Sequence, residues 1–185
     1  MMGAPRRAVW LLCGALALGA LTAGWLTEAR AETRRQTRES IGLEAGDRPP
    51  PFSATDLNGH AQTLSQYRGQ VVVLHFWASW CPYCRGEIPK LKQVHAQGSS
   101  NGVAVVAVSV DDDVDALQRF LASSALGYPV IADADTDPSL ADQYDISGIP
   151  VTYIVMRDGH IASKLEGSSD IAGAVQQALA LSPST

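Results

Sequence analysis

Hydrophobic and polar positions divide the chain into an apolar amino-terminal run and a longer body of alternating strand-like and helix-like segments. Residues 71–76 and 103–110 are apolar at almost every position, which is typical of strands buried on both faces of a sheet. Helices are predicted over residues 84–97 and 114–126, the second with Asp113 as its cap. This alternation predicts an α/β domain with a mixed central sheet covered on both faces.

Turn signals supply the remaining elements of the body. Asn58-Gly59 is a strong two-residue hairpin signal, and it is expected to join short strands at 52–57 and 62–64. A helix is expected to start at Asp137, with Pro138 in its first position. That helix runs to about residue 144. The other predicted elements are a short strand at 128–132, two hairpin strands at 151–156 and 160–165, and a last helix at 171–181.

The amino terminus, residues 1–27, is predicted to be a membrane signal anchor. Arg6 and Arg7 precede twenty uncharged residues, enough helix to cross about 30 Å of bilayer core. A signal peptide cleaved after Ala31 stays open as an alternative, because residues 29–31 read Ala-Arg-Ala. Both interpretations export the rest of the chain. Residues 28–45 are then a polar, flexible spacer and residues 46–185 the folded domain.

Composition and charge exclude several classes of protein. The chain is 46% hydrophobic and 18% charged, which fits neither a disordered chain nor a protein with many membrane spans. Residues 1–40 carry six Arg against three Glu, whereas the remainder carries eight basic and sixteen acidic residues. An acidic body repels phosphate backbones, so no nucleic-acid binding is expected.

The candidate chemistry lies in Cys81 and Cys84, which stand between a buried strand and the following helix. Cysteines at this spacing can close a small disulfide ring. The amino terminus of the helix stabilises a thiolate on the first sulfur, and the thiolate is the species that attacks a disulfide. We expect Cys81 to be exposed and to attack a partner's disulfide, and Cys84, less exposed, to resolve the mixed disulfide.

Metal and haem sites are weaker interpretations of the same residues. No second cysteine pair accompanies the first, the four histidines are scattered, and Arg85 stands where haem attachment requires a histidine. An inert structural disulfide stays open. The acidic run 133–137 hints at calcium, but Pro138 and Tyr144 replace the required Gly and Glu, so turn and cap roles are predicted. No metal or bound cofactor is expected.

Residues 76–89, which read FWASWCPYCRGEIP, resemble the thioredoxin superfamily, and more narrowly the exported TlpA/ResA/CcmG-type thiol-disulfide oxidoreductases. Residues 49–52, 58–59 and 64–69 resemble the same group, and the likeness extends over residues 46–181. It implies a thioredoxin fold with an amino-terminal β-hairpin and a central insertion. It also implies a monomer at the periplasmic face of a bacterial inner membrane, or free in the periplasm if the chain is cleaved. Expected partners are a membrane-embedded electron donor and disulfide-bearing or dithiol client proteins, with cytochrome c maturation or envelope thiol homeostasis as the process.

The resemblance also assigns roles to single residues. Pro150 is expected in a cis-proline loop beside the cysteines, where the Ile149 backbone pairs with an extended client segment. Glu87 either exchanges protons with Cys84 or is a solvated first-turn glutamate. His75, where thioredoxin carries a buried Asp, is either a proton acceptor or a packed core histidine. The residues expected to contact a client directly are Trp80, Pro82 and Tyr83.

Electron flow and two rival functions stay open. The ring between the cysteines holds no carboxylate, so we expect a pKa of Cys81 below the usual value of about 8.5. The reduction potential is then expected between those of thioredoxin and DsbA, about −270 and −120 mV, and the protein is expected to act as a reductant. The rivals are a thiol peroxidase of the peroxiredoxin class and a redox-inactive thioredoxin-fold binding module.

Overall fold

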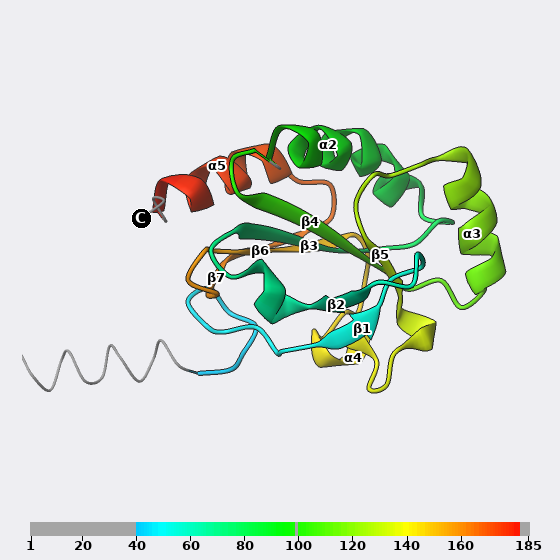
Figure 1. Ribbon diagram of the computed structural model, residues 1–185, viewed down its shortest axis with the longest axis horizontal. Helices are drawn as coiled ribbons and strands as arrows, with labels where there is room; N and C mark the ends of the chain where they lie inside the picture. The colour runs from blue at the N-terminus through cyan, green and yellow to red at the C-terminus, as the bar shows by residue number, and fades with distance from the viewer. Residues whose placement is uncertain (1–39, 99, 182–185) are drawn as a thin grey trace, which may run out of the picture. The chain divides into compact units, whose positions relative to one another are not determined.

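A five-stranded mixed sheet forms the centre of the domain in the computed structural model, which describes residues 40–98 and 100–181 (Figure 1). The strand order is β5-β4-β3-β6-β7, with β3 in the middle. β3 runs parallel to β4 and antiparallel to β6. The strands span Val71–Trp77 (β3), Val103–Ser109 (β4), Val130–Ala132 (β5), Val151–Val155 (β6) and Ile161–Glu166 (β7). Every residue of β3 and β4 is buried, as predicted for central strands.

Helices cover both faces of this sheet. α2 and α5 pack on one face, and α4 lies on the other with a separate hairpin of β1 and β2 (Figure 1). The segment between β4 and β6 carries α3, β5 and α4, which corresponds to the predicted central insertion. The helices span Pro82–Gly98 (α2), Val114–Ser123 (α3), Leu140–Gln143 (α4) and Ile171–Leu181 (α5), with short 3-10 turns at Leu64–Tyr67 (η1) and Asp133–Asp135 (η2).

Alternation along β3 assigns its side chains to two apolar clusters. Val71, Val73 and Trp77 belong to the cluster that includes Cys81 and Cys84. The residues between them, Val72, Leu74 and Phe76, pack in a second cluster with α4. Because strand side chains alternate between faces, His75 points to the same face as the first set, which is the face of the cysteines.

The predicted two-residue turn of the first hairpin is wrong. β1 (Ser53–Thr55) and β2 (Ala61–Thr63) pair Thr55 with Ala61, so five residues connect the strands. Asp56 explains the wider loop. Its buried carboxylate accepts the N–H groups of Asn58 and His60, both at 2.9 Å, and the side-chain amide of Gln62 at 2.9 Å.

The predicted start of the helix at Asp137 is also wrong. The Asp137–Pro138 bond is cis, and α4 begins two residues later with Ser139 as its N-cap. The carboxylate of Asp133 accepts the N–H groups of Leu140 and Ala141, at 2.6 and 3.2 Å. Asp133 thus carries the turn and cap role predicted for the acidic run. The cap predicted at Asp113 is confirmed, since it accepts the N–H of Ala116 at 3.0 Å.

The described chain is hydrogen-bonded to the domain from Ser40 onward, six residues before the predicted boundary. Arg48 donates its backbone N–H to the carbonyl of Ser40 at 2.9 Å, and Gly46 donates to Ile161 at 2.8 Å. Within residues 40–98 and 100–181, no helix has the length and apolarity needed to cross a membrane. The predicted signal anchor, residues 1–27, lies outside the described residues.

Candidate active site

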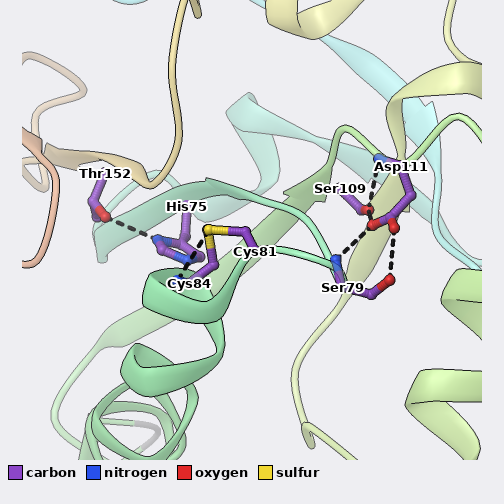
Figure 2. The surroundings of a disulfide bond; sticks show 7 residues. All are labelled: His75, Ser79, Cys81, Cys84, Ser109, Asp111 and Thr152. Atoms are coloured by element: carbon purple, nitrogen blue, oxygen red, sulfur yellow. Dashed lines mark hydrogen bonds between the residues drawn. A yellow bond between two sulfur atoms is a disulfide. The ribbon is translucent and has the colours of Figure 1, made fainter.

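Cys81 and Cys84 form a disulfide where the loop after β3 enters α2, with their Cα atoms 5.3 Å apart (Figure 2). Cys81 is the residue before the helix, and Cys84 is in its first turn. The Cys84 N–H donates to the Cys81 sulfur at 3.2 Å. A free N–H at the start of the helix therefore reaches the first sulfur, as stabilisation of a Cys81 thiolate requires.

The expected exposure of Cys81 is wrong. Cys81 is 4% exposed and Cys84 is fully buried. The chain turns back directly after Trp77, the Cys81 N–H donates to the Ala78 carbonyl at 3.2 Å, and both cysteines pack in the apolar cluster on the α2 face of the sheet. The small accessible fraction nevertheless belongs to Cys81, so the difference between the two cysteines has the predicted direction.

Exposed aromatic side chains flank the disulfide. Trp80 is 64% exposed and Tyr83 is 74% exposed, and Pro82 between them is also exposed. Large exposed apolar side chains beside a reactive group are typical of a surface that contacts a partner. The structure therefore places the three predicted client-contact residues around the cysteines and accessible to a protein partner.

The loop that precedes β6 has the predicted cis bond between Ile149 and Pro150. Pro150 is buried, and Ile149 is half-buried against the apolar cluster that contains both cysteines. The carbonyl of Pro150 accepts the N–H of Gly167 at 2.9 Å, which ties this loop to the end of β7. A pocket of about 220 Å³ beside the loop is lined by Ile149, Pro150 and polar residues that include Lys164 and Glu166.

His75 is a buried histidine with one partnered nitrogen. It is 1% exposed, and its Nδ1 lies 2.9 Å from the hydroxyl of Thr152, its neighbour on β6 (Figure 2). Its Nε2 is buried and has no hydrogen-bond partner among the described residues. Burial lowers the pKa of His75 to about 4, so the ring is neutral at physiological pH. Burial and the contact with Thr152 are those of a packed core histidine, whereas the unpartnered Nε2 is what a proton acceptor requires.

Glu87 is also buried, so its interpretation as a solvated first-turn residue is wrong. It is 1% exposed, and its Oε1 accepts the N–H of Ser169 at 3.1 Å. Its Oε2 has no partner within the described part of the chain. Burial raises the pKa of Glu87, against the opposing effects of the Ser169 hydrogen bond and the charge of Lys90. The carboxyl group therefore holds a proton to a higher pH than a solvated glutamate.

Asp111 is a second buried acidic residue near the disulfide, and the sequence did not predict its role. It is 3% exposed and is hydrogen-bonded to Ser79 and Ser109 next to the disulfide (Figure 2). Its signal in the sequence is weak. It is the first of three aspartates after a buried strand, where carboxylates ordinarily face solvent or cap a helix.

Comparison with known proteins gives consistent results. The model of the AhpC/TSA family matches residues 45–164. Thiol-disulfide oxidoreductase ResA of Bacillus subtilis (strain 168) is 34% identical over 131 residues, which are 71% of this chain and 71% of that protein. The ResA protein of Geobacillus kaustophilus (strain HTA426) is 28% identical over 130 residues, 70% of this chain and 74% of that one.

Solved structures show the same likeness. A thiol:disulfide interchange protein DsbE from Chlorobium tepidum is 30% identical, with a TM-score of 0.66 over 76% of this chain and 98% of that chain. The thioredoxin domain of a thiol-disulfide oxidoreductase from Bacteroides vulgatus is 23% identical, with a TM-score of 0.66 over 74% of this chain and 98% of that chain. The predicted thioredoxin fold and the predicted resemblance are both confirmed.

Proposed function

Because this chain belongs to the AhpC/TSA family and is a thiol-disulfide oxidoreductase, we propose that it reduces protein disulfides outside the cytoplasm through Cys81 and Cys84. The observation that carries the proposal is the cysteine pair at the start of α2, with a helix N–H on the first sulfur and exposed aromatic residues around it. Such a site suits exchange with another protein, since exposed side chains surround it and a cysteine pair can exchange two electrons with a disulfide.

The reaction follows from the order of the two cysteines. The Cys81 thiolate attacks one sulfur of the client's disulfide, and the client's other sulfur leaves as a thiolate, which is then protonated. Cys84, after losing its proton, attacks the Cys81 sulfur and releases the second client thiol. The client gains two electrons, and the Cys81–Cys84 disulfide returns. A membrane-embedded donor then reduces that disulfide to restore the active dithiol.

The second step requires a base for Cys84, because its fully buried thiol cannot give its proton directly to water. His75 faces the cysteine cluster as a neutral ring with Nε2 unpartnered among the described residues. Glu87 is three residues after Cys84, about one helical turn away, and its Oε2 also has no partner among the described residues. We assign Glu87 to proton transfer at Cys84, as acceptor in reduction of a client and as donor in the reverse direction, and His75 as a second proton acceptor.

Client binding uses the exposed residues and the cis-proline loop. Trp80, Pro82 and Tyr83 supply apolar contact beside the sulfur, and the backbone of Ile149 pairs with an extended client segment, as in strand addition. The client segment then lies between Cys81 and Pro150. Alanine at Trp80 or Tyr83 is expected to raise KM for a protein client several-fold while leaving the reaction with a small disulfide unchanged.

Location and client class rest on the sequence. The apolar run that ends at residue 27 supports attachment to the outer face of a bacterial inner membrane, with apocytochrome c or cell-envelope proteins as clients. An intact amino terminus in membranes washed with carbonate is the expected result. A soluble mature protein starting at Glu32 contradicts the anchor and supports cleavage.

Thiol peroxidase activity is the second candidate, favoured by the match to the AhpC/TSA model. The test mixes the reduced full-length protein, in detergent, with either a disulfide-bearing protein or hydrogen peroxide, and follows loss of the protein's own thiols. Reduction of the protein disulfide at the higher rate supports our proposal, and faster oxidation by peroxide overturns it. Titration against glutathione gives the reduction potential of the Cys81–Cys84 pair. A value below that of thioredoxin, about −270 mV, contradicts the expected potential between those of thioredoxin and DsbA.

A further inference from the structure

The loop that carries Cys81 is short and has few anchors of its own. Residues 78–81 connect β3 to α2, and Trp80, the largest side chain among them, is 64% exposed. In the disulfide form the bond to Cys84 holds Cys81 in place. This bond is absent while Cys81 is a thiolate or is joined to a client, so another contact has to keep Cys81 against the helix in those states.

Asp111 makes that contact from the segment that follows the neighbouring strand, β4. Its Oδ2 accepts the backbone N–H of Ser79 at 2.8 Å, and its Oδ1 accepts the Ser79 hydroxyl at 2.6 Å. The hydroxyl of Ser109 donates to Oδ2 at 2.5 Å. We call these three residues the Asp111 clamp. The Asp111 carboxylate is hydrogen-bonded to the backbone N–H and the hydroxyl of Ser79, which lies two positions before Cys81.

The sheet explains how the clamp forms. β3 and β4 are parallel and end in register, with Trp77 beside Ser109. The segments that leave the two strands therefore run side by side, and the Val110 N–H donates to the Trp77 carbonyl at 2.8 Å. A carboxylate one position beyond Val110 can then reach the free N–H of the loop that follows β3 (Figure 2).

The chemistry of the clamp makes it strong and specific. Hydrogen bonds to a carboxylate are shorter and roughly twice as strong as those between neutral groups. A buried carboxylate that lacks donors is very unfavourable, so the three donors and the burial of Asp111 require one another. Thermal motion of the loop would have to break bonds to both oxygens together.

We propose that Asp111 is a positioning residue for the exchange reaction, because through Ser79 it holds the Cys81 sulfur against the Cys84 N–H when no disulfide joins them. This inference rests on the proposed function. Its effect belongs to the reduced protein and the mixed disulfide. Loss of the clamp is expected to slow attack by Cys81 and, where the charge of Asp111 is kept, to raise the pKa of the Cys81 thiol.

The experiment uses the reduced full-length protein and two matched pairs of variants. Ser79→Ala removes the hydroxyl donor and keeps the charge of Asp111, whereas Ser79→Thr keeps the hydroxyl. Asp111→Asn removes the clamp's charge, and Asp112→Asn removes the same charge from an exposed neighbour. Two rates are measured against pH: reduction of a disulfide-bearing protein, and alkylation of the Cys81 peptide by iodoacetamide, read by mass spectrometry so that Cys13 does not contribute.

Ser79→Ala and Asp111→Asn are expected to slow disulfide reduction at least about tenfold, since small misplacements of a reacting group cost that much or more. Ser79→Thr and Asp112→Asn are expected to stay within about twofold of the parent. In Ser79→Ala the alkylation profile shifts to higher pH. A purely structural clamp would change the unfolding midpoint and leave this profile in place.

Two results overturn the inference: unchanged rates in Ser79→Ala and Asp111→Asn, or an unfolded Asp111→Asn together with a parental rate and pH profile in Ser79→Ala. Failure of the proposed function looks different, because the parent protein itself then leaves the protein disulfide intact. The alkylation profile of Cys81 in Ser79→Ala tests the clamp whichever result the parent gives.

Discussion

Two buried acidic groups near the cysteine pair differ in how completely they are hydrogen-bonded. Both oxygens of Asp111 accept hydrogen bonds, three in all from Ser79 and Ser109. Glu87, three residues after Cys84 in α2, accepts a single N–H from Ser169, and its second oxygen has no partner in the described residues. The first arrangement fixes a loop, and the second leaves a group able to exchange a proton.

The surroundings of each acid account for this difference. Asp111 follows β4 and faces a loop whose backbone N–H groups are not used by a helix or sheet, so donors are at hand. Glu87 lies inside α2, where the helix's own N–H groups bond to its carbonyls, and a donor has to come from the segment before α5. His75 has the same half-complete hydrogen bonding, because Nδ1 contacts Thr152 and Nε2 has no partner in the described residues.

Truncation of Asp111 gives the largest expected change in stability. Asp111→Ala leaves the half-buried Ser79 N–H and two hydroxyls without their acceptor, so we expect a loss of about 3 to 4 kcal/mol in the free energy of unfolding. Urea unfolding of the oxidised protein measures it, with Asp112→Ala as the exposed control. A loss below about 1 kcal/mol would show that the two acids do not differ as described.

His75 is expected to make stability fall in acid. Its pKa is lowered from 6.5 to about 4, so between these values the unfolded chain binds a proton that the folded protein refuses. The stabilisation is complete above pH 6.5 and falls by about 3 kcal/mol as the pH approaches 4. In His75→Asn, which can keep the bond to Thr152, this fall in stability between pH 6.5 and 4 should be absent.

The measurement is the free energy of unfolding at several pH values for both proteins. His60→Asn is the control, because the side chain of His60 is 74% exposed. If the free energy of unfolding changes with pH in the same way in the parent and in His75→Asn, burial of a neutral His75 is contradicted.

Glu87→Gln is expected to stabilise the fold slightly while slowing the reaction. The raised pKa of Glu87 means that the folded protein binds a proton more tightly than the unfolded chain, so stability falls as pH rises above about 4.5. Glutamine keeps an acceptor for Ser169 and cannot ionise, so a gain of about 1 kcal/mol at pH 7 is expected, with none in strong acid.

The same variant lacks the carboxyl group assigned to proton exchange with Cys84, so its rate of client release should fall by about a hundredfold. Unfolding curves at pH 4 and 7 and a stopped-flow measurement of client release test the two effects together. If Glu87→Gln is less stable than the parent at pH 7 and releases the client at the parental rate, Glu87 has a purely structural role.

Much of this arrangement was predictable because it is encoded locally. The uninterrupted apolar runs predict β3 and β4, and the spacing of Cys81 and Cys84 before a helix predicts their pairing. Side-chain hydrogen bonds to the backbone explain the errors. Asp56 widens a turn that Asn58-Gly59 alone would make tight, and Ser139 with Asp133 moves the start of a helix.

The unpredicted parts of the site depend on contacts between distant segments. Glu87 is buried because the residues before α5 close over it, and nothing near it in the sequence signals this. Asp111 meets Ser79 across 32 positions through the register of two parallel strands. Burial of Cys81 likewise follows from the packed cluster around it and not from its place at a helix start.

In the proposed reaction Cys81 attacks and Cys84 resolves, although Cys81 is only 4% exposed and Cys84 is fully buried. The direct measurement is mass spectrometry of mixed disulfides formed by the full-length Cys84→Ser and Cys81→Ser variants with a disulfide-bearing protein. We expect Cys84→Ser to accumulate a stable adduct at Cys81, and Cys81→Ser to accumulate none. Equal adducts in both variants, or an adduct at Cys84 alone, would contradict it.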